Sequence, residues 1–158
     1  MRDLFPYPRR RDWTIRWVEF MKDSQDLAAE LVLDWEDLNC IMWCCQWIES
    51  CTGYDPYEPF VHAKGVKGAV SAIKDAGYET LDQIIGSHLY EVPLAKAQTG
   101  DLVLIRADWE APEAIKTVLP HGIALADPPL YWCITPEGLG KGDLYVNGVK
   151  AYAVGRTI

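Results

Sequence analysis

The segment Asn39–Thr52 constrains the fold more than any other part of this sequence. Written as a helix, it carries apolar side chains nearly all round, with Gln46, Glu49 and Ser50 as its main polar interruptions. A helix without a wide polar face has to be buried on most of its sides. Gly53 follows as a natural C-terminal stop. We therefore predict that this segment is the central, buried helix of the fold.

Helices are predicted mainly in the first half of the chain. They cover residues 12–22, 25–33 and 65–76, the last closed by Gly77, and a short stretch that follows Thr80. Asp12 is a candidate N-cap for the first helix, with Trp17 and Met21 on its apolar side. Gln83 stands three residues after Thr80, which is the spacing of a capping box.

Strands are predicted in the second half. Short apolar or β-rich runs lie between Gly, Pro and Asp at residues 102–105, 123–126, 130–134, 144–146 and 152–154. Such spacing indicates an antiparallel sheet. The glycine-rich run at 138–142 does not lie between a strand and a helix, as a phosphate-binding loop would, and it is interpreted as a turn. Helices followed by strands predict an α+β domain with the buried helix laid against the sheet.

Charge and length exclude several classes of protein. The 158 residues suit one domain, and 15 basic against 23 acidic residues give a net charge of −8. Nucleic-acid binding depends on clustered Lys and Arg, so we expect no nucleic-acid partner. No apolar run approaches the about 18 residues that cross a bilayer, and no secretory signal is recognisable. We expect a chain made in the cytoplasm, with no membrane span.

Five cysteines are present, and four of them lie between Cys40 and Cys51. An odd number crowded on one segment is a poor disulfide framework, so reduced thiols are expected. A zinc site is the competing interpretation. However, Cys44 and Cys45 are adjacent and point in different directions on a helix, and only Cys133 is distant, which does not fit paired zinc ligands. We expect neither a metal nor a cofactor.

Cys40 and His121 are the candidate catalytic residues. Cys40 stands at the start of the buried helix, where unpaired N–H groups and the helix dipole favour a thiolate, while Asp34, Glu36 and Asp37 upstream oppose it. The alternative is a structural Cys, buried as a small hydrophobe. His121 opens a predicted strand directly after Pro120, a position from which it can serve a Cys as base.

The other two histidines, His62 and His88, are expected to be solvated residues of loops and helix ends.

The order of these motifs resembles the NlpC-type cell-wall cysteine peptidases, a papain-like family. The resemblance is closer to a divergent branch found among phage tail proteins of unassigned function. It rests on Trp35 before Asn39-Cys40, Thr52-Gly53-Tyr54-Asp55, Gly100-Asp101-Leu102-Val103-Leu104, His121-Gly122-Ile123-Ala124-Leu125 and Ala151-Tyr152-Ala153-Val154-Gly155. Two departures stand out. Asn39 replaces the usual Asp, and the strand 130–134 lacks the polar residue that orients the histidine, for which Tyr131 or Thr135 would have to substitute.

The resemblance implies a papain-like NlpC-type α+β fold and a phage tail tip or baseplate setting. Cys40 would attack a stem-peptide carbonyl of peptidoglycan, with His121 as base and then acid. The alternative in the same setting is a structural tail-assembly component that kept the fold without the activity. Its partners would be other phage tail proteins, and its location the virion tail after synthesis in the host cytoplasm. A third interpretation is a soluble bacterial cysteine hydrolase or binding domain of this fold, unrelated to virions.

Residues 1–11 are predicted to form an extended arm before a single domain at 12–158. Pro6 and Pro8 keep the arm extended. Its apolar residues Leu4, Phe5 and Tyr7 and the basic cluster at 9–11 have no obvious partner in the nearby sequence. Because aromatic residues and Arg supply much of the energy of interfaces, we expect a partner protein to hold the arm.

Overall fold

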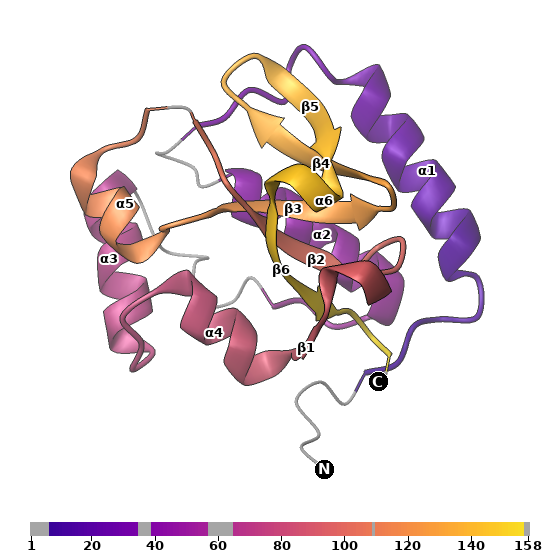
Figure 1. Cartoon of the computed structure of the whole chain (residues 1–158), viewed down its shortest axis with the longest axis horizontal. Helices are drawn as coiled ribbons and strands as arrows, with labels where there is room; N and C mark the ends of the chain where they lie inside the picture. The colour runs from indigo at the N-terminus through magenta and orange to yellow at the C-terminus, as the bar shows by residue number, and fades with distance from the viewer. Residues whose placement is uncertain (1–6, 35–38, 57–64, 109, 157–158) are drawn as a thin grey trace.

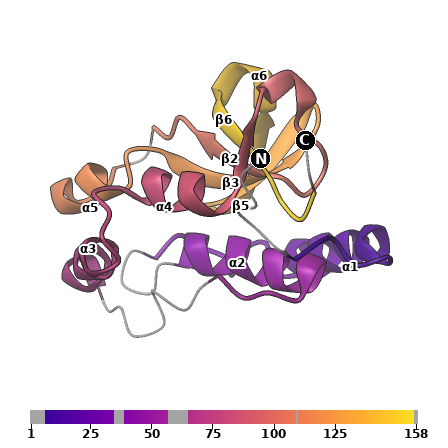
Figure 2. The same ribbon diagram turned by 90° about the horizontal axis from the view of Figure 1, so that it is seen from below.

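The computed structural model describes residues 7–34, 39–56, 65–108 and 110–156, and these form an α+β fold. The two longest helices, α1 (Trp13–Asp26) and α2 (Asn39–Thr52), lie side by side in one layer beneath the sheet (Figures 1 and 2). α2 packs directly on strands β3 (Gly122–Asp127) and β4 (Leu130–Thr135). The predicted α+β class is confirmed.

The described strands form one six-stranded sheet in which every neighbouring pair is antiparallel, as predicted. Their order across the sheet is β1 (Tyr90–Val92), β6 (Gly148–Ala153), β2 (Leu102–Ile105), β3, β4 and β5 (Gly138–Asp143). β2 has the predicted bounds, and its four residues are all buried. It lies between β6 and β3 with both faces covered, which is why its sequence is a continuous apolar run.

The next helices along the chain, α3 (Gly65–Asp75), α4 (Leu81–His88) and α5 (Glu113–Val118), are shorter. The predicted capping of α4 is confirmed: the Gln83 N–H donates to Thr80 Oγ1 over 3.2 Å, and Gln83 Oε1 accepts from the Glu79 N–H over 2.8 Å. Gly53 and Gly77 adopt φ values of +85° and +88°, the left-handed conformation expected just after a helix.

The central position of α2 is confirmed, because most of its residues are buried. Trp47 is fully buried, and its Nε1–H donates to the Gly100 carbonyl over 2.9 Å. The ring of Trp17 from α1 meets Trp47 edge-on, with ring centroids 4.9 Å apart. The helical face of the sheet therefore has a core of large rings, which suits the high Trp content of the chain.

The opposite face of the sheet is packed differently. Its buried residues include Ala124, Ala126, Ala151 and Ala153. The short helix α6 (Leu144–Asn147) and the 3₁₀ turn η2 (Leu94–Lys96) lie on this side, and Leu144 is buried among the alanines. Small side chains allow these two short elements to approach the sheet closely.

The predicted second helix at 25–33 is wrong. α1 continues to Asp26, and residues 27–30 then form turns. The backbone of this segment is used by the β4–β5 hairpin instead: the Leu33 N–H donates to the Thr135 carbonyl over 2.9 Å, and the Ala28 carbonyl accepts from the Leu139 N–H over 3.0 Å. A tertiary pairing thus replaces the local helix.

The predicted strand at 144–146 is also wrong, since these residues belong to α6. The carboxylate of Asp143 accepts hydrogen bonds from the Tyr145 and Val146 N–H groups over 2.8 and 3.2 Å, so it caps a helix that starts at Leu144. An Asp N-cap favours helix over strand at this point.

The glycine-rich run at 138–142 forms β5 rather than a turn. Its glycines fit the crowded surface of the hairpin. A Cβ on Gly140 would lie 2.7 Å from Thr135 Cγ2, and one on Gly142 would collide with the Tyr131 ring. Glycine inside a strand marks such a close approach.

No helix within the described residues combines the length and apolarity that crossing a membrane requires.

Candidate functional site

Cys40 is the second residue of α2, at the helix start where the sequence placed it. Its side chain is buried, with 8 % exposed. Asn39 holds the chain that enters the helix: Oδ1 accepts from the Asp34 N–H over 2.9 Å, and Nδ2 donates to the Val32 carbonyl over 2.6 Å. An ionised aspartate only accepts, so it could not make the second bond. The pair of bonds explains why an amide suits this position in this chain.

His121 lies just before β3, so its predicted place at a strand start is confirmed. Its Nδ1 lies 2.8 Å from Oδ2 of Asp82, which belongs to the first turn of α4. Both side chains are partly buried, with 32 % of His121 and 24 % of Asp82 exposed. A carboxylate at Nδ1 favours the tautomer with the proton on that nitrogen, which leaves Nε2 with the lone pair of a base.

Cys40 and His121 line the same small cavity of about 20 Å³. The thiol comes from the start of α2 and the imidazole from the start of β3, and the contact between α2 and β3 brings these two ends together. In the described part of the chain, Asp82 rather than Cys40 is the hydrogen-bond partner of the ring. The remaining walls of this cavity are apolar or glycine: Leu33, Ile41, Leu81, Leu119, Gly122, Ile123 and Ile134.

Burial raises the pKa of the Cys40 thiol to about 11. The backbone N–H groups of Ile41 and Cys40 itself act in the opposite direction and lower this pKa, as expected at a helix start. Desolvation is the larger effect. Cys40 is therefore protonated at neutral pH, and attack by this sulfur requires a base that removes the proton.

The hydrogen-bond partner of His121 comes from helix α4 and not from strand β4, where the sequence offers Tyr131 and Thr135. Tyr131 and Thr135, on the strand after His121, do not serve it. Tyr131 Oη accepts from Asn147 Nδ2 over 3.3 Å, and Thr135 Oγ1 donates to the Gly138 carbonyl over 2.8 Å. The partner is Asp82, whose only signal in the sequence is its place in the first turn after the Thr80 cap.

The other two histidines lie apart from this pair or outside the described residues. His88 is exposed at the end of α4, and its Nδ1 lies 2.8 Å from the Ile84 carbonyl, which agrees with the predicted solvated position. His62 lies outside the described residues, as does Trp35 of the motif before Asn39.

The remaining cysteines are buried, free thiols, as predicted. Burial raises the pKa of each of them, to about 11 for Cys51 and about 12 for Cys133. Among the described residues, no group of three or more Cys, His, Asp or Glu side chains is arranged to hold a metal ion.

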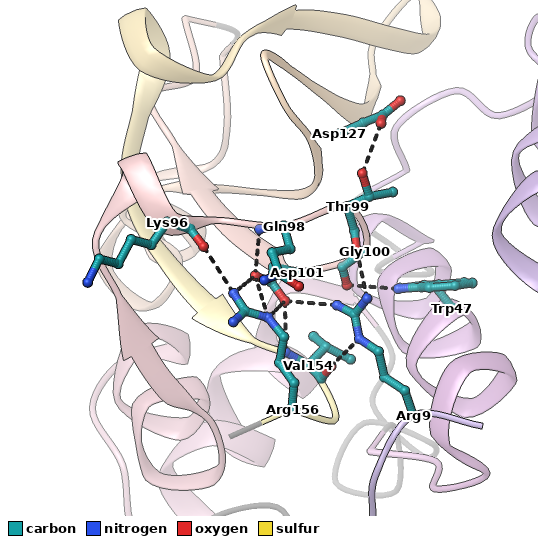
Figure 3. Close-up of polar contacts among 10 residues, drawn as sticks. All are labelled: Arg9, Trp47, Lys96, Gln98, Thr99, Gly100, Asp101, Asp127, Val154 and Arg156. Carbon is teal, nitrogen blue, oxygen red and sulfur yellow. Dashed lines mark hydrogen bonds and ion pairs between the residues drawn. The ribbon is translucent and has the colours of Figure 1, made fainter. Parts of the chain in front are cut away.

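The Gly100-Asp101 motif forms a second polar cluster (Figure 3). Asp101 is fully buried and pairs with two guanidinium groups: Arg9 Nη2 lies 3.0 Å from Oδ1, and Arg156 donates through Nε and Nη2. The N–H groups of Gln98 and Val154 also donate to this carboxylate, over 2.9 and 3.1 Å.

Arg9, at the end of the predicted extended arm (residues 1–11), is bonded to the domain that follows. Its N–H donates to the Gly155 carbonyl over 2.8 Å, and its guanidinium also donates to the Thr99 and Val154 carbonyls. Tyr7 stacks on Tyr54 with ring centroids 4.8 Å apart. Leu4 and Phe5 lie outside the described residues. The basic cluster contributes at least one residue, Arg9, to bonds within the domain.

Comparison with known proteins gives a family and no curated relative. No curated protein matches the sequence significantly. A family described as a domain of unknown function (DUF6950) matches residues 8–154, a span that contains Cys40, Asp82, Asp101 and His121. Because this match covers nearly the whole chain, the protein belongs to the DUF6950 family.

Proposed function

We propose that this protein is a cysteine hydrolase with an NlpC-type papain-like fold, in which Cys40 is the nucleophile, His121 the base and Asp82 the positioning residue. One observation carries the proposal: the ring of His121, which shares a cavity with Cys40, is held by a carboxylate at Nδ1. That arrangement leaves Nε2 available to take a proton. It supplies the orienting group that the strand after His121 lacks.

The reaction runs through an acyl-enzyme. The Cys40 proton passes to His121 Nε2 as Sγ attacks the substrate carbonyl carbon, and the Cys40 backbone N–H helps to stabilise the oxyanion. The C–N bond then breaks, and the leaving amine takes the proton from His121. Water attacks the thioester with His121 again as base, which releases the acid and restores the thiol.

The proposed setting follows the resemblance of the sequence motifs. It is the tail tip or baseplate of a phage, with other tail proteins as partners and a peptidoglycan stem peptide as substrate. A soluble bacterial cysteine hydrolase of the same fold would use the same three residues.

A structural tail-assembly component is the second candidate. It is favoured by the burial of Cys40, which keeps the thiol protonated, and by the lack of a hydrogen bond between Cys40 and His121 within the described residues. In this case the Cys40 cavity has no catalytic role.

The two candidates are separated by incubating the purified full chain with peptidoglycan and with synthetic stem peptides, and measuring the release of new amino groups. We expect wild type to be active and Cys40→Ala and His121→Ala to lose at least about 10²-fold in rate, the lower end of what a positioned base contributes. Cys133→Ala removes a buried thiol from the other face of the sheet and is the matched control. Equal release by wild type and Cys40→Ala would contradict the hydrolase.

A further inference from the structure

An apolar cavity of about 270 Å³ lies next to the proposed catalytic residues. Helices α2 and α4 provide most of its walls, and β2 and β3 close it with Leu102 and Ile123. Most of the described residues that line it are Ile, Leu or Cys.

This cavity adjoins the smaller one that Cys40 and His121 line, because Ile41, Leu81 and Ile123 belong to both. Each shared residue is also close in sequence to a member of the proposed site. Ile41 follows Cys40, Leu81 precedes Asp82, and Ile123 is two residues after His121. The walls that separate the two spaces are therefore set by the same turns of chain that position the site.

The lining determines what kind of group fits. None of the described lining residues is Asp, Glu, Lys or Arg. Apart from the cysteine thiols, the polar side chains of the lining are those of Tyr54 and the exposed His88. A charged group placed here would lose its hydration without gaining an oppositely charged partner among the described lining residues. An apolar cavity of about 150 Å³ holds benzene, so about 270 Å³ accommodates a chain of roughly eight carbons.

We propose that this cavity binds the apolar acyl group of the substrate whose carbonyl Cys40 attacks, an inference that rests on the proposed hydrolase chemistry of Cys40 and not on peptidoglycan as the substrate. With an ester, Sγ forms a bond to the acyl carbon, the C–O bond breaks, and the thiol proton reaches the leaving oxygen through His121. The acyl group then remains on Cys40 as a thioester, with its chain in the cavity, until water releases it. The same chemistry serves an acyl chain in an ester or an apolar side chain on the acyl side of a peptide bond.

The test compares chain lengths. For 4-nitrophenyl acetate, butyrate and octanoate, we expect kcat/KM of the full chain to rise at least tenfold from acetate to octanoate. Peptides with leucine or alanine before the scissile bond separate the two sources of the acyl group. Preference for leucine assigns the cavity to a peptide side chain, and preference confined to the esters assigns it to an acyl chain.

Two variants examine the wall itself. Ile84→Phe narrows the cavity at a half-buried position, and Ile84→Gln places an amide there without enlarging the side chain. Both should reduce kcat/KM for 4-nitrophenyl octanoate at least tenfold more than they reduce kcat/KM for 4-nitrophenyl acetate. Ile15→Phe, at a residue of α1 that is 61 % exposed, is the matched control.

Binding of free octanoate to the Cys40→Ala variant, measured by calorimetry, separates the two proposals. Binding that Ile84→Phe abolishes, with no ester cleaved by wild type, contradicts the proposed function and supports the cavity as an acyl-binding site. If wild type cleaves the acetate and octanoate esters at equal rates and free octanoate does not bind, the proposed acyl-binding role of the cavity is overturned. The proposed function is then supported.

Discussion

Asp101 and Asp82 are two carboxylates that pair with cationic or imidazole side chains in very different ways. Asp101 is fully buried and surrounded by five nitrogen donors, from Arg9, Arg156 and two backbone N–H groups (Figure 3). Asp82 is about a quarter exposed, and His121 is its one hydrogen-bond partner within the described residues.

The difference indicates different tasks. A buried carboxylate with every lone pair used ties together the chain segments that bring its donors, here the residues around 9, 98 and 154–156. It has no free position for a ligand. A carboxylate with one imidazole partner beside a cavity holds that ring in one tautomer and leaves the far nitrogen available. The first cluster is structural, and the second is suited to chemistry.

The largest expected effect comes from breaking the structural cluster. Asp101→Asn leaves two guanidinium groups without their shared counter-charge in a buried place, so we expect the free energy of unfolding to fall by about 3–5 kcal/mol. Urea unfolding measures it. Asp12→Asn, which removes an exposed ion pair with Arg16, is the matched control and should change little. A loss equal to that of the control would mean that the Asp101 cluster is not structural.

The second effect separates activity from stability at Asp82. Asp82→Asn removes the charge that fixes the His121 ring. We expect the rate of substrate hydrolysis to fall by about 10²-fold, which is the loss of rate typical of a misplaced catalytic group. The free energy of unfolding should change by less than about 1 kcal/mol, because the pair is partly exposed. Asp82→Glu retains the charge and should recover part of the rate. Full activity in Asp82→Asn would make Asp82 a surface residue without a role in the site.

A third prediction concerns the protonation of Cys40. Burial penalises the thiolate, so the pKa of Cys40 rises to about 11 and the thiolate fraction at neutral pH falls about 100-fold below that of an exposed thiol. Alkylation of Cys40 by iodoacetamide, followed by mass spectrometry, should accelerate with each pH unit up to about 11. A plateau already near pH 8 would show that burial does not raise the pKa of Cys40.

The smallest effect is expected at the cap of α4. Thr80→Ala removes the acceptor of the Gln83 N–H and should cost about 1 kcal/mol in the free energy of unfolding. Because Asp82 lies in the capped turn, the rate of substrate hydrolysis should also fall slightly. Thr117→Ala in α5, where the hydroxyl bonds only to the Glu113 carbonyl and is exposed, is the control. Equal stability of the two variants would show that the cap does not hold this turn.

Much of the secondary structure followed from local patterns, and the errors have identifiable causes. The buried helix, strand β2 and the Thr80 cap were predicted because their signals lie within a few consecutive residues. The helix at 25–33 failed because its backbone pairs with the β4–β5 hairpin. The strand at 144–146 failed because Asp143 caps a helix there. The family-specific part of the fold prediction, its papain-like NlpC-type identity, remains a proposal.

The sequence by itself determined that Cys40 lies at the start of an apolar helix and that His121 directly precedes a strand. The spacing of apolar residues and the positions of Gly and Pro are local properties of the chain. Only the tertiary structure decided that α2 and β3 bring these two residues to one cavity, that Asp82 holds the ring from 39 positions away, and that Arg9 meets Asp101. Such pairs depend on how helices pack and how strands register. Many residues share a suitable side chain, and packing selects which of them meet.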